Sequence, residues 1–520
     1  MRPLIMTLAT VAGIGAAKAE PVTPTFRDMS AALPVSHVYD GGWEHFVGGG
    51  VAVFDCNADQ LPDAFVAGGT NPARLLINRS AIGGRLDFQL SNGALKLTGV
   101  TGAYPINIDG DTHIDLVVLR VGENILLRGL GKCTFARANE AWQFDGGDSW
   151  STSFTATWET GAQWPTLFIG NYVDRTDPEG PFEACDANEL HRPQGQGFAQ
   201  PVRLEPGFCA LSALISDELR KGRRDLRISN DRHYYVRGGS EQKLRLDTLE
   251  FLGEADGWPT VSLWGMGIAA QDITGDGRAE VMSTSMGDQL MQIATDEGYE
   301  NAPFSMGTYA QKPFFGDDGR PSTGWHAQFG DVNNDGRPDL FIAKGNVDQM
   351  PSNAIKDPNT LLLQTETGSF VETALAAGVA TTDRSRGAAL VDFNADGRLD
   401  LMVVNRRAPL ELYQNDSPVS GNWLKLDLSG DAANVHAIGA IIEARTIKGT
   451  HTREVTIGGG HAGGQLGAHH FGVGDAESVA LRVIAPDGTP ALDWTELPVN
   501  TRCTLSLANA VYECAMPGAG

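Results

Sequence analysis

Basic residues are scarce in this chain of 520 residues. Lysine and arginine together number 40, against 64 aspartates and glutamates, and the formal net charge is -24. The deficit excludes a nucleic-acid binder that works through a basic face, and it excludes adsorption to membranes through a polybasic patch. It also agrees with a shortage of long amphipathic helices.

Long apolar runs and familiar catalytic motifs are missing as well. After residue 19 no apolar run reaches the roughly 18 residues that a transmembrane helix needs, so we expect a mature protein without a membrane span. The motifs G-x-S-x-G and H-E-x-x-H and the P-loop do not occur, which favours a protein that is not an enzyme.

The first 19 residues predict a signal peptide. Arg2 forms a short basic region, residues 4–17 are an apolar stretch too short to cross a bilayer, and Ala17-Lys18-Ala19 is an A-x-A cleavage site. We expect cleavage after Ala19 and bacterial export to the periplasm or the medium. The alternative is a buried N-terminal helix, which no capping residue or amphipathic period supports.

The six cysteines fit an oxidising compartment, and none of their spacings is C-x-x-C. Closeness in sequence favours two disulfides and leaves a third: Cys185 with Cys209, Cys503 with Cys514, and Cys56 with Cys133. The third pair must bridge two neighbouring repeats, and a thiol or metal role for Cys56 is its alternative.

Glycine is what the sequence has in abundance, with 63 residues beside 26 prolines. Many glycines without a collagen-like period predict tight turns between short strands, and therefore an all-β repeat protein. An acidic segment recurs with first positions at residues 55, 107, 158, 217, 272, 331 and 392. These spacings each match one four-stranded blade, so the sequence predicts a seven-bladed β-propeller.

The sixth repeat shows the expected order of strands. The second strand is predicted at residues 340–343, the third at 361–364 and the outer one at 369–373. The seventh repeat supplies a third strand at 410–414, after which the sequence no longer follows the repeat pattern. Because residues 26–33 resemble residues 370–377, we expect the N-terminus to complete the last blade and close the ring.

Five of the seven loops carry oxygen-bearing side chains at positions 1, 3, 5 and 9. Such a loop can surround one hard cation with roughly six or seven oxygens, and the lack of nitrogen and sulfur donors favours calcium. We expect about five calcium ions and none in the eroded loops at 158 and 217; the alternative is Asx-rich turns without an ion. The predicted ligands are Asp55, Asn57, Asp59, Asp63, Asn107, Asp109, Asp111, Asp115, Asp272, Thr274, Asp276, Glu280, Asp331, Asn333, Asp335, Asp339, Asp392, Asn394, Asp396 and Asp400.

These five copies, followed by an apolar strand, resemble the FG-GAP/VCBS repeats of integrin-alpha-like propellers. Behind them, residues 434–440, 453–455, 458–461, 470–474 and 486–488 resemble the ASPIC/UnbV C-terminal domain of cartilage-acidic-protein-like secreted proteins. The order of the two parts matches that family. The resemblance implies an extracellular calcium-binding protein that binds a protein or glycan.

We expect four parts along the chain: a signal peptide at 1–19, the propeller at 20–418, an ASPIC/UnbV-like β domain at 419–502 and a tail at 503–520. Residues 423–428, 440–445, 454–457 and 479–484 alternate like the short strands of a small β-sandwich. His461, His469 and His470 lie close together in this sequence. A packed turn is their expected role, and a metal site is the alternative.

The loops opposite the acidic ones are expected to meet at one mouth of the central channel. Aromatic, amide and arginine side chains at these positions suit the recognition of sugar or peptide. The candidate ligand-binding residues are His45, Asn171, Asn230, Trp264, Met266, Trp325, His326, Asn346, Arg386 and Asn405. Two alternatives stay open: these residues cap strand ends and fill the channel, or His45, His326 and Met266 hold copper or another transition metal.

The sequence thus predicts an exported calcium-binding propeller that acts as a binding module for a protein or glycan ligand at the channel mouth. No nucleic-acid partner is expected. The alternative is an enzyme at the same mouth, either a lyase or hydrolase of acidic glycans or a transition-metal enzyme, because propellers host both binders and enzymes.

Overall fold

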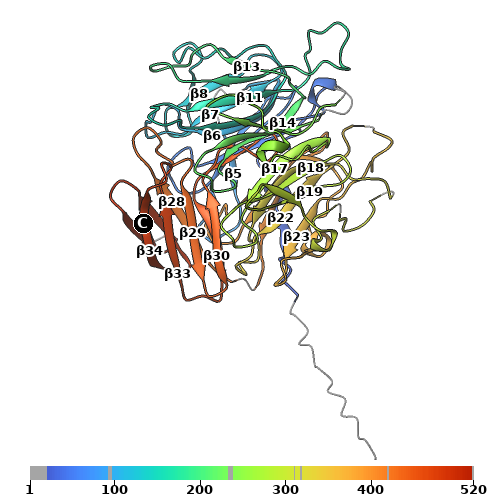
Figure 1. The fold of residues 1–520 in the computed structure, drawn as a ribbon. Helices are drawn as coiled ribbons and strands as arrows, with labels where there is room; N and C mark the ends of the chain where they lie inside the picture. The colour runs from blue at the N-terminus through green and yellow to red at the C-terminus, as the bar shows by residue number, and fades with distance from the viewer. Residues whose placement is uncertain are drawn as a thin grey trace, which may run out of the picture.

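The computed structural model describes residues 20–517 except 92–95, 232–237, 310, 317–318, 349 and 419–420, so the predicted signal peptide lies outside the described residues. The fold is all-β and consists of many small sheets of about four strands, consistent with propeller blades (Figure 1). The helices found are α1 (Ala374–Ala377) and the short 3-10 turns η1 (Ser30–Ala32), η2 (Trp43–His45), η3 (Glu254–Asp256) and η4 (Phe304–Met306). Within the described ranges, no helix has the length and apolar character needed to cross a membrane.

Seven sheets follow one another between residues 26 and 415 of the described chain. The first four consist of β2 (Val51–Phe54), β3 (Asp63–Val66), β4 (Arg74–Asn78) and β5 (Phe88–Leu90); β6 (Val100–Ile106), β7 (Asp115–Arg120), β8 (Ile125–Gly129) and β9 (Phe135–Arg137); β10 (Ser151–Thr157), β11 (Thr166–Asn171), β12 (Asn188–His191) and β13 (Val202–Leu204); and β14 (Ala210–Ser216), β15 (Asp225–Asn230) and β16 (Gln242–Arg245). The other three consist of β17 (Gly265–Gln271), β18 (Glu280–Ser285), β19 (Leu290–Ala294) and β20 (Tyr299–Asn301); β21 (Gly324–Gly330), β22 (Asp339–Lys344), β23 (Thr360–Gln364) and β24 (Phe370–Glu372); and β25 (Arg384–Val391), β26 (Asp400–Arg406), β27 (Glu411–Asn415) and β1 (Phe26–Asp28).

The last of these sheets takes its outer strand from the start of the described chain. β1 pairs antiparallel with β27, and Phe26 lies opposite Asn415. Phe26 is buried in the same apolar cluster as Tyr413 and Val379. The prediction that the N-terminal segment completes the last repeat is therefore confirmed, and the pairing covers an edge of that sheet.

The innermost strands of the seven sheets form a closed series of neighbours. β2 contacts β6, β6 contacts β10, and the series continues through β14, β17, β21 and β25, which contacts β2 again. Four of these strands, β2, β6, β10 and β14, are buried along their whole length. The first and last sheets therefore lie side by side although their sequences are far apart.

Residues 422–515 form two further sheets, drawn in orange to red beside the others in Figure 1. One consists of β32 (His469–Gly474), β28 (Asn422–Ser429), β35 (Thr501–Ser506) and β36 (Val511–Ala515), and the other of β30 (Gly449–Glu454), β29 (Ile441–Thr446), β33 (Ser478–Ile484) and β34 (Pro490–Pro498). Leu426 of one sheet and Ile442 of the other share one apolar cluster, as expected of a sandwich. We call these two sheets the C-terminal sandwich.

The C-terminal sandwich differs from the sequence prediction at two places. Its strands continue past residue 502, because β36 pairs with β35 in the region expected to be a tail. The strand expected at 454–457 is absent, since β30 already ends at Glu454. The next residues leave the sheet and enter the ring of innermost strands.

We call residues 455–466 the plug segment, because they lie against five of the seven innermost strands. Ile457 bridges Ala156 of β10, and Gly458, Gly460 and Gly463 bridge β14, β17 and β6 in turn. β31 (Gln465–Leu466) then pairs parallel with β2. Between β30 and β32 the chain therefore leaves the C-terminal sandwich and passes inside the ring.

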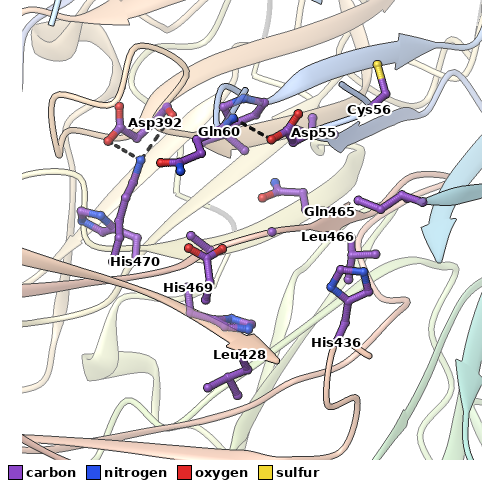
Figure 2. Close-up of a pocket in the computed structure, with 18 of the residues that line it drawn as sticks. Asp55, Cys56, Gln60, Asp392, Leu428, His436, Gln465, Leu466, His469 and His470 are labelled. Carbon is purple, nitrogen blue, oxygen red and sulfur yellow. Dashed lines mark hydrogen bonds and ion pairs between the residues drawn. The ribbon is translucent and has the colours of Figure 1, made fainter. Parts of the chain in front are cut away.

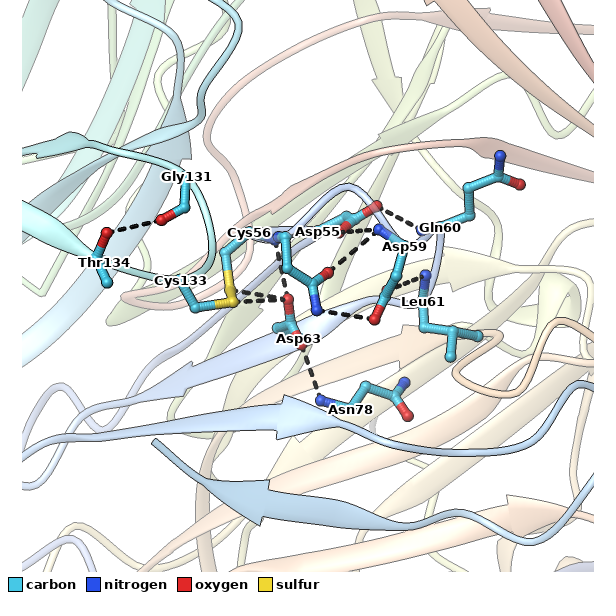
Figure 3. The surroundings of a disulfide bond; sticks show 11 residues. Asp55, Cys56, Asp59, Gln60, Leu61, Asp63, Asn78, Gly131, Cys133 and Thr134 are labelled. Atoms are coloured by element: carbon cyan, nitrogen blue, oxygen red, sulfur yellow. Dashed lines mark hydrogen bonds between the residues drawn. A yellow bond between two sulfur atoms is a disulfide. The ribbon is translucent and has the colours of Figure 1, made fainter. Parts of the chain in front are cut away.

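The six cysteines form three disulfide bonds: Cys56–Cys133, Cys185–Cys209 and Cys503–Cys514. Two of these bonds close short segments, and Cys56–Cys133 joins the first sheet's acidic loop to the second sheet (Figure 3). Two of them are the pairs that closeness in sequence favours, and Cys56–Cys133 is the pair that this choice left, so the alternative of a thiol or metal role for Cys56 is wrong.

Candidate functional site

Each acidic loop joins the innermost strand of a sheet to the second strand. The fourth loop position has a left-handed backbone in all seven copies, with φ between 54° and 80°; the residues are Ala58, Gly110, Gly161, Arg220, Gly275, Asn334 and Ala395. Four of these are not glycine, so the sequence pattern does not reveal this common turn. The eroded loops at 158 and 217 keep the backbone shape although they have lost most of the oxygens.

In the loop at 331, three predicted ligands gather around one backbone amide. The N–H of Asp335 donates to Oδ1 of Asp331 at 3.0 Å and to Oδ1 of Asn333 at 3.1 Å. The N–H of Gly336 donates to the other Asp331 oxygen at 2.7 Å. The carboxylate and amide oxygens of positions 1, 3 and 5 are thus held close together.

The same arrangement occurs in two other loops and changes in the remaining two. The loops at 392 and 55 repeat it through Asp392, Asn394 and Asp396 and through Asp55, Asn57 and Asp59 (Figure 3). In the loops at 107 and 272 the first residue accepts from the fourth instead: Gly110 N–H donates to Asn107 at 2.8 Å, and Gly275 N–H donates to Asp272 at 2.7 Å.

The predicted ligands at position 9 are fully buried and hold the loop to the sheet. Oδ2 of Asp339 accepts the N–H of Val332 at 3.0 Å, while Oδ1 accepts the N–H of Gln364 in the third strand at 3.0 Å. The equivalent residues that accept the N–H of their loop's second residue are Asp63, Asp115, Glu280 and Asp400. Sequence reasoning missed this anchoring role, because a carboxylate that binds a metal ion and a carboxylate that holds a loop to a sheet look the same in a sequence.

Several carboxylates of these loops lie away from water. Burial, aided by the neighbouring Asp335 carboxylate, raises the pKa of Asp331 to about 8. Burial also raises the pKa of Asp63 and of Asp115 to about 7. A bound cation would favour the ionised carboxylates, and an all-oxygen donor set suits a hard cation such as calcium. The residues present therefore fit calcium.

Protein cations form ion pairs with the carboxylates of four of the five loops. Lys425 Nζ lies 2.6 Å from Asp392 Oδ2, and Arg128 Nε lies 2.6 Å from Asp109 Oδ2. Arg337 and Arg278 pair with the fifth-position aspartates of their own loops. In the described part of the chain the loop at 55 has no such ion pair. The five loops are therefore not equivalent electrostatically.

Nine of the ten predicted channel-mouth residues are buried, and Trp264 is partly exposed. Most of their polar groups have partners within the protein, whereas Nε2 of His45 and Nε2 of His326 have none among the described residues. Arg386 donates to the carbonyl of Phe46 at 2.9 Å and stacks 4.0 Å over Trp325, whose Nε1–H donates to the carbonyl of Gly345. The structure thus packs these side chains inside the protein.

Three of the predicted asparagines, Asn171, Asn230 and Asn405, lie at the end of the second strand of a sheet, and Asn346 lies two residues after the end of β22. In each case the side-chain amide donates to a backbone carbonyl of the following turn: Asn171 to Ala187, Asn230 to Ser240, Asn346 to Met350 and Asn405 to Pro409, at 2.9 to 3.0 Å. This repeated bond caps the strand end.

His461 of the plug segment lies among the remaining mouth residues. Its Nε2 accepts the N–H of Gly48 at 3.1 Å, and its Nδ1 lies 3.1 Å from the carbonyl of Met266. Its backbone N–H donates to Nδ1 of His326. Among the described residues, three metal-ligand atoms of the His, Cys, Asp or Glu type converge only at Cys56, Asp63 and Cys133, where the disulfide removes both thiols.

On the side of the acidic loops a cavity of about 800 Å³ lies between the sheets of the ring and the C-terminal sandwich (Figure 2). Acidic-loop residues such as Asp55 and Asp392 form one wall, and His436, His469 and His470 form the other. Sequence reasoning missed this cavity because its walls come from distant segments. The grouping of two of the histidines in sequence was the available signal.

Comparisons with known proteins match parts of this chain. The family described as FG-GAP-like repeat matches residues 331–403, and the family described as ASPIC and UnbV matches residues 430–511. Cartilage acidic protein 1 of Xenopus tropicalis is 32% identical over 109 residues, which are 20% of this chain and 17% of that protein. The human protein is 30% identical over 109 residues, 20% of this chain and 16% of that protein. The chain thus matches less than a fifth of the length of these relatives.

The solved structures found to be similar to this chain differ widely from it in sequence. The extracellular domain of a putative hybrid two-component system from B. thetaiotaomicron has a TM-score of 0.41 and 9% identity, over 92% of this chain and 59% of that one. A lectin of Agrocybe aegerita that recognises non-reducing terminal N-acetylglucosamine has a TM-score of 0.39 and 15% identity, over 71% of this chain and 97% of that one.

The chain therefore carries an FG-GAP-like repeat followed by an ASPIC and UnbV domain, as its motifs predict, and it has weak homology to cartilage acidic protein 1.

Proposed function

We propose that this protein is an exported, calcium-binding, seven-bladed propeller that acts as a binding module for a protein or glycan ligand. The observation that carries the proposal is the set of five loops in which side-chain oxygens gather around a common turn and a buried carboxylate stands at position 9. Calcium, when bound, would balance the negative charge of these carboxylates. The FG-GAP-like repeat and the ASPIC and UnbV domain support a binding role over a catalytic one.

The closed series of innermost strands supports seven blades, because β25 returns to β2. The three disulfides support an oxidising compartment, as expected of an exported protein. Protein or glycan recognition fits the rim of the channel mouth, since the deeper residues are packed around the plug segment. On this rim Trp43 is 46% exposed and its ring lies edge-on to Trp150.

Calcium counting on the purified full chain tests the metal part of the proposal. After treatment with chelator and dialysis into calcium buffer, we expect about five ions per chain. The double variant Asp331→Asn, Asp335→Asn should lose one of them.

The matched control is Asp217→Asn, which changes the first position of an eroded loop and should leave the count unchanged. A chain that retains no calcium, or a double variant that retains as much as the wild type, would contradict the proposal.

A further inference from the structure

The cavity between the acidic loops and the C-terminal sandwich has the size of a small-molecule site. Its volume of about 800 Å³ falls within the range of known ligand pockets, which often lie between domains. Apolar side chains, among them Leu428, Leu466 and Val455, share its walls with charged and imidazole groups. Such a lining suits a ligand that has an apolar body and a polar group.

Arg453 of β30 is the cation on this wall that has no carboxylate partner among the described residues. Its Nε donates to Oε1 of Gln271 at 3.1 Å, and its Nη1 donates to the carbonyl of His470 at 3.3 Å. Both acceptors are neutral, and Nη2 has no acceptor in the described chain. Burial of a charge without a counter-ion is costly, so this guanidinium is suited to an anionic ligand.

The two other cations on the wall are already paired. Lys425 lies 2.6 Å from Asp392, and Arg502 lies 2.5 Å from Asp427. A fourth lining cation, Lys132, comes from the ring and is exposed to solvent, so Arg453 is the partly buried cation that is available to an added anion. Arginine is also the side chain best suited to carboxylate and related oxyanions, because its N–H groups form a planar fork.

Two imidazoles on the same wall can add a donor each. No hydrogen bond joins the ring of His436 or His469 to another described residue, and both rings line the cavity (Figure 2). Burial lowers the pKa of His436 to about 4 and that of His469 to about 3, so both rings are neutral near pH 7. A neutral imidazole offers one N–H donor and one acceptor.

We propose that this cavity binds a small amphipathic organic anion, with its oxyanion group on Arg453 and its apolar body against Leu428, Leu466 and the imidazoles. The inference rests on the proposed role of the chain as a binding module and not on the number of calcium ions. It adds a second site and a different class of ligand to the protein or glycan recognition proposed for the rim.

The test uses the calcium-saturated full chain and two fluorescent probes with the same ring system. 1-Anilinonaphthalene-8-sulfonate carries a negative charge, and N-phenyl-1-naphthylamine lacks it. We expect saturable binding of one sulfonate probe per chain, weakened about tenfold or more in Arg453→Gln, because a hydrogen bond to a charged group is lost. Binding of the neutral probe should be the same in both proteins.

Three further variants complete the test. Arg453→Lys keeps the charge and should retain most of the binding of the sulfonate probe. Arg445→Gln removes an exposed arginine that stacks on Trp494 at 3.9 Å and should change nothing. Ala468→Phe fills the cavity from its wall and should weaken both probes.

Thermal unfolding separates a binding role of Arg453 from a structural one. Because this partly buried charge has no carboxylate partner, Arg453→Gln should unfold at the same temperature as the wild type or higher. A lower unfolding temperature, equal loss of both probes, or unchanged binding of the sulfonate probe would overturn the proposal. Calcium counted on the same samples shows whether the proposed calcium function fails separately.

Discussion

His461 illustrates how single residues of the plug segment are fixed. Its side chain is fully buried, and both ring nitrogens have backbone partners, Gly48 and Met266. Burial lowers the pKa of His461 to about 3, and the nearby Arg386 and His326 act in the same direction. A proton added at Nε2 would face the N–H of Gly48. The neutral ring is therefore the form that the native state requires.

This residue predicts a pH dependence of stability. Between pH 6.5, the ordinary pKa of histidine, and about 3, the unfolded chain binds a proton at His461 and the native state does not. The contribution of the neutral His461 ring to the free energy of unfolding should therefore be fully present above pH 6.5. It should decrease as the pH falls below this value, by about 1.4 kcal/mol per pH unit. His461→Gln keeps a donor and an acceptor but cannot titrate, so acidification from pH 6.5 to about 4.5 should cost it about 2 kcal/mol less than the wild type.

Urea unfolding at the two pH values in calcium buffer measures this difference. The control is a comparison of the variant with the wild type at about pH 7.5. His461 is uncharged there in both the native and the unfolded state, so the two proteins differ only in packing. Equal losses of stability on acidification would refute the role assigned to His461.

At the scale of elements, the plug segment meets the innermost strands through glycines. A Cβ added to Gly463 would lie 2.3 Å from the carbonyl oxygen of Val51. On the ring side, a Cβ on Gly50 or Gly102 would lie 1.7 or 2.0 Å from the carbonyl oxygen of Ala462. Backbone thus packs directly on backbone, and side chains larger than hydrogen do not fit at these positions.

Gly463→Ala should therefore destabilise the protein by about 2 to 4 kcal/mol, because the carbonyl of Val51 must move. Gly467→Ala is the matched control four residues away, where an added Cβ meets no atom within 4 Å. Chemical unfolding of both variants checks the prediction. A Gly463→Ala protein as stable as the control would show that the segment does not pack in the ring as described.

The strands and acidic loops were predictable from sequence, whereas the plug segment was not. The second strand of the sixth repeat was expected at 340–343 and spans Asp339–Lys344, because local alternation and the loop motif fix it. Gly458, Gly459 and Gly460 have the composition of a turn, and their partners lie far away in the chain. The cavity around Arg453 could not be predicted for the same reason, since its walls depend on how the sandwich sits on the loops.

At the scale of the whole molecule, one apolar cluster joins the ring to the C-terminal sandwich. Phe154 and Trp158 of the third repeat share it with Leu424 and Leu481 of the sandwich, and Ile457 of the plug segment belongs to it as well. Parts that share a core lose their packing together. We therefore expect a single cooperative unfolding transition rather than one for each part.

Scanning calorimetry of the calcium-loaded full chain tests this expectation. The single transition should move to lower temperature in chelator, because ions bound only by the native state stabilise it by mass action. Two well-separated transitions would contradict a shared core, and an unchanged temperature in chelator would contradict structural calcium.

The bond between Gly48 and His461 also sets the timing of folding. These residues are 413 positions apart, and a ribosome that adds roughly 5 to 20 residues per second needs about 20 to 80 seconds to cover that distance. During this interval the residues of the first sheet have been synthesised and the segment that later occupies the ring has not. The nascent chain therefore cannot reach its final state from the N-terminus onward, and refolding from denaturant should be slow, as is typical of topologies dominated by distant contacts.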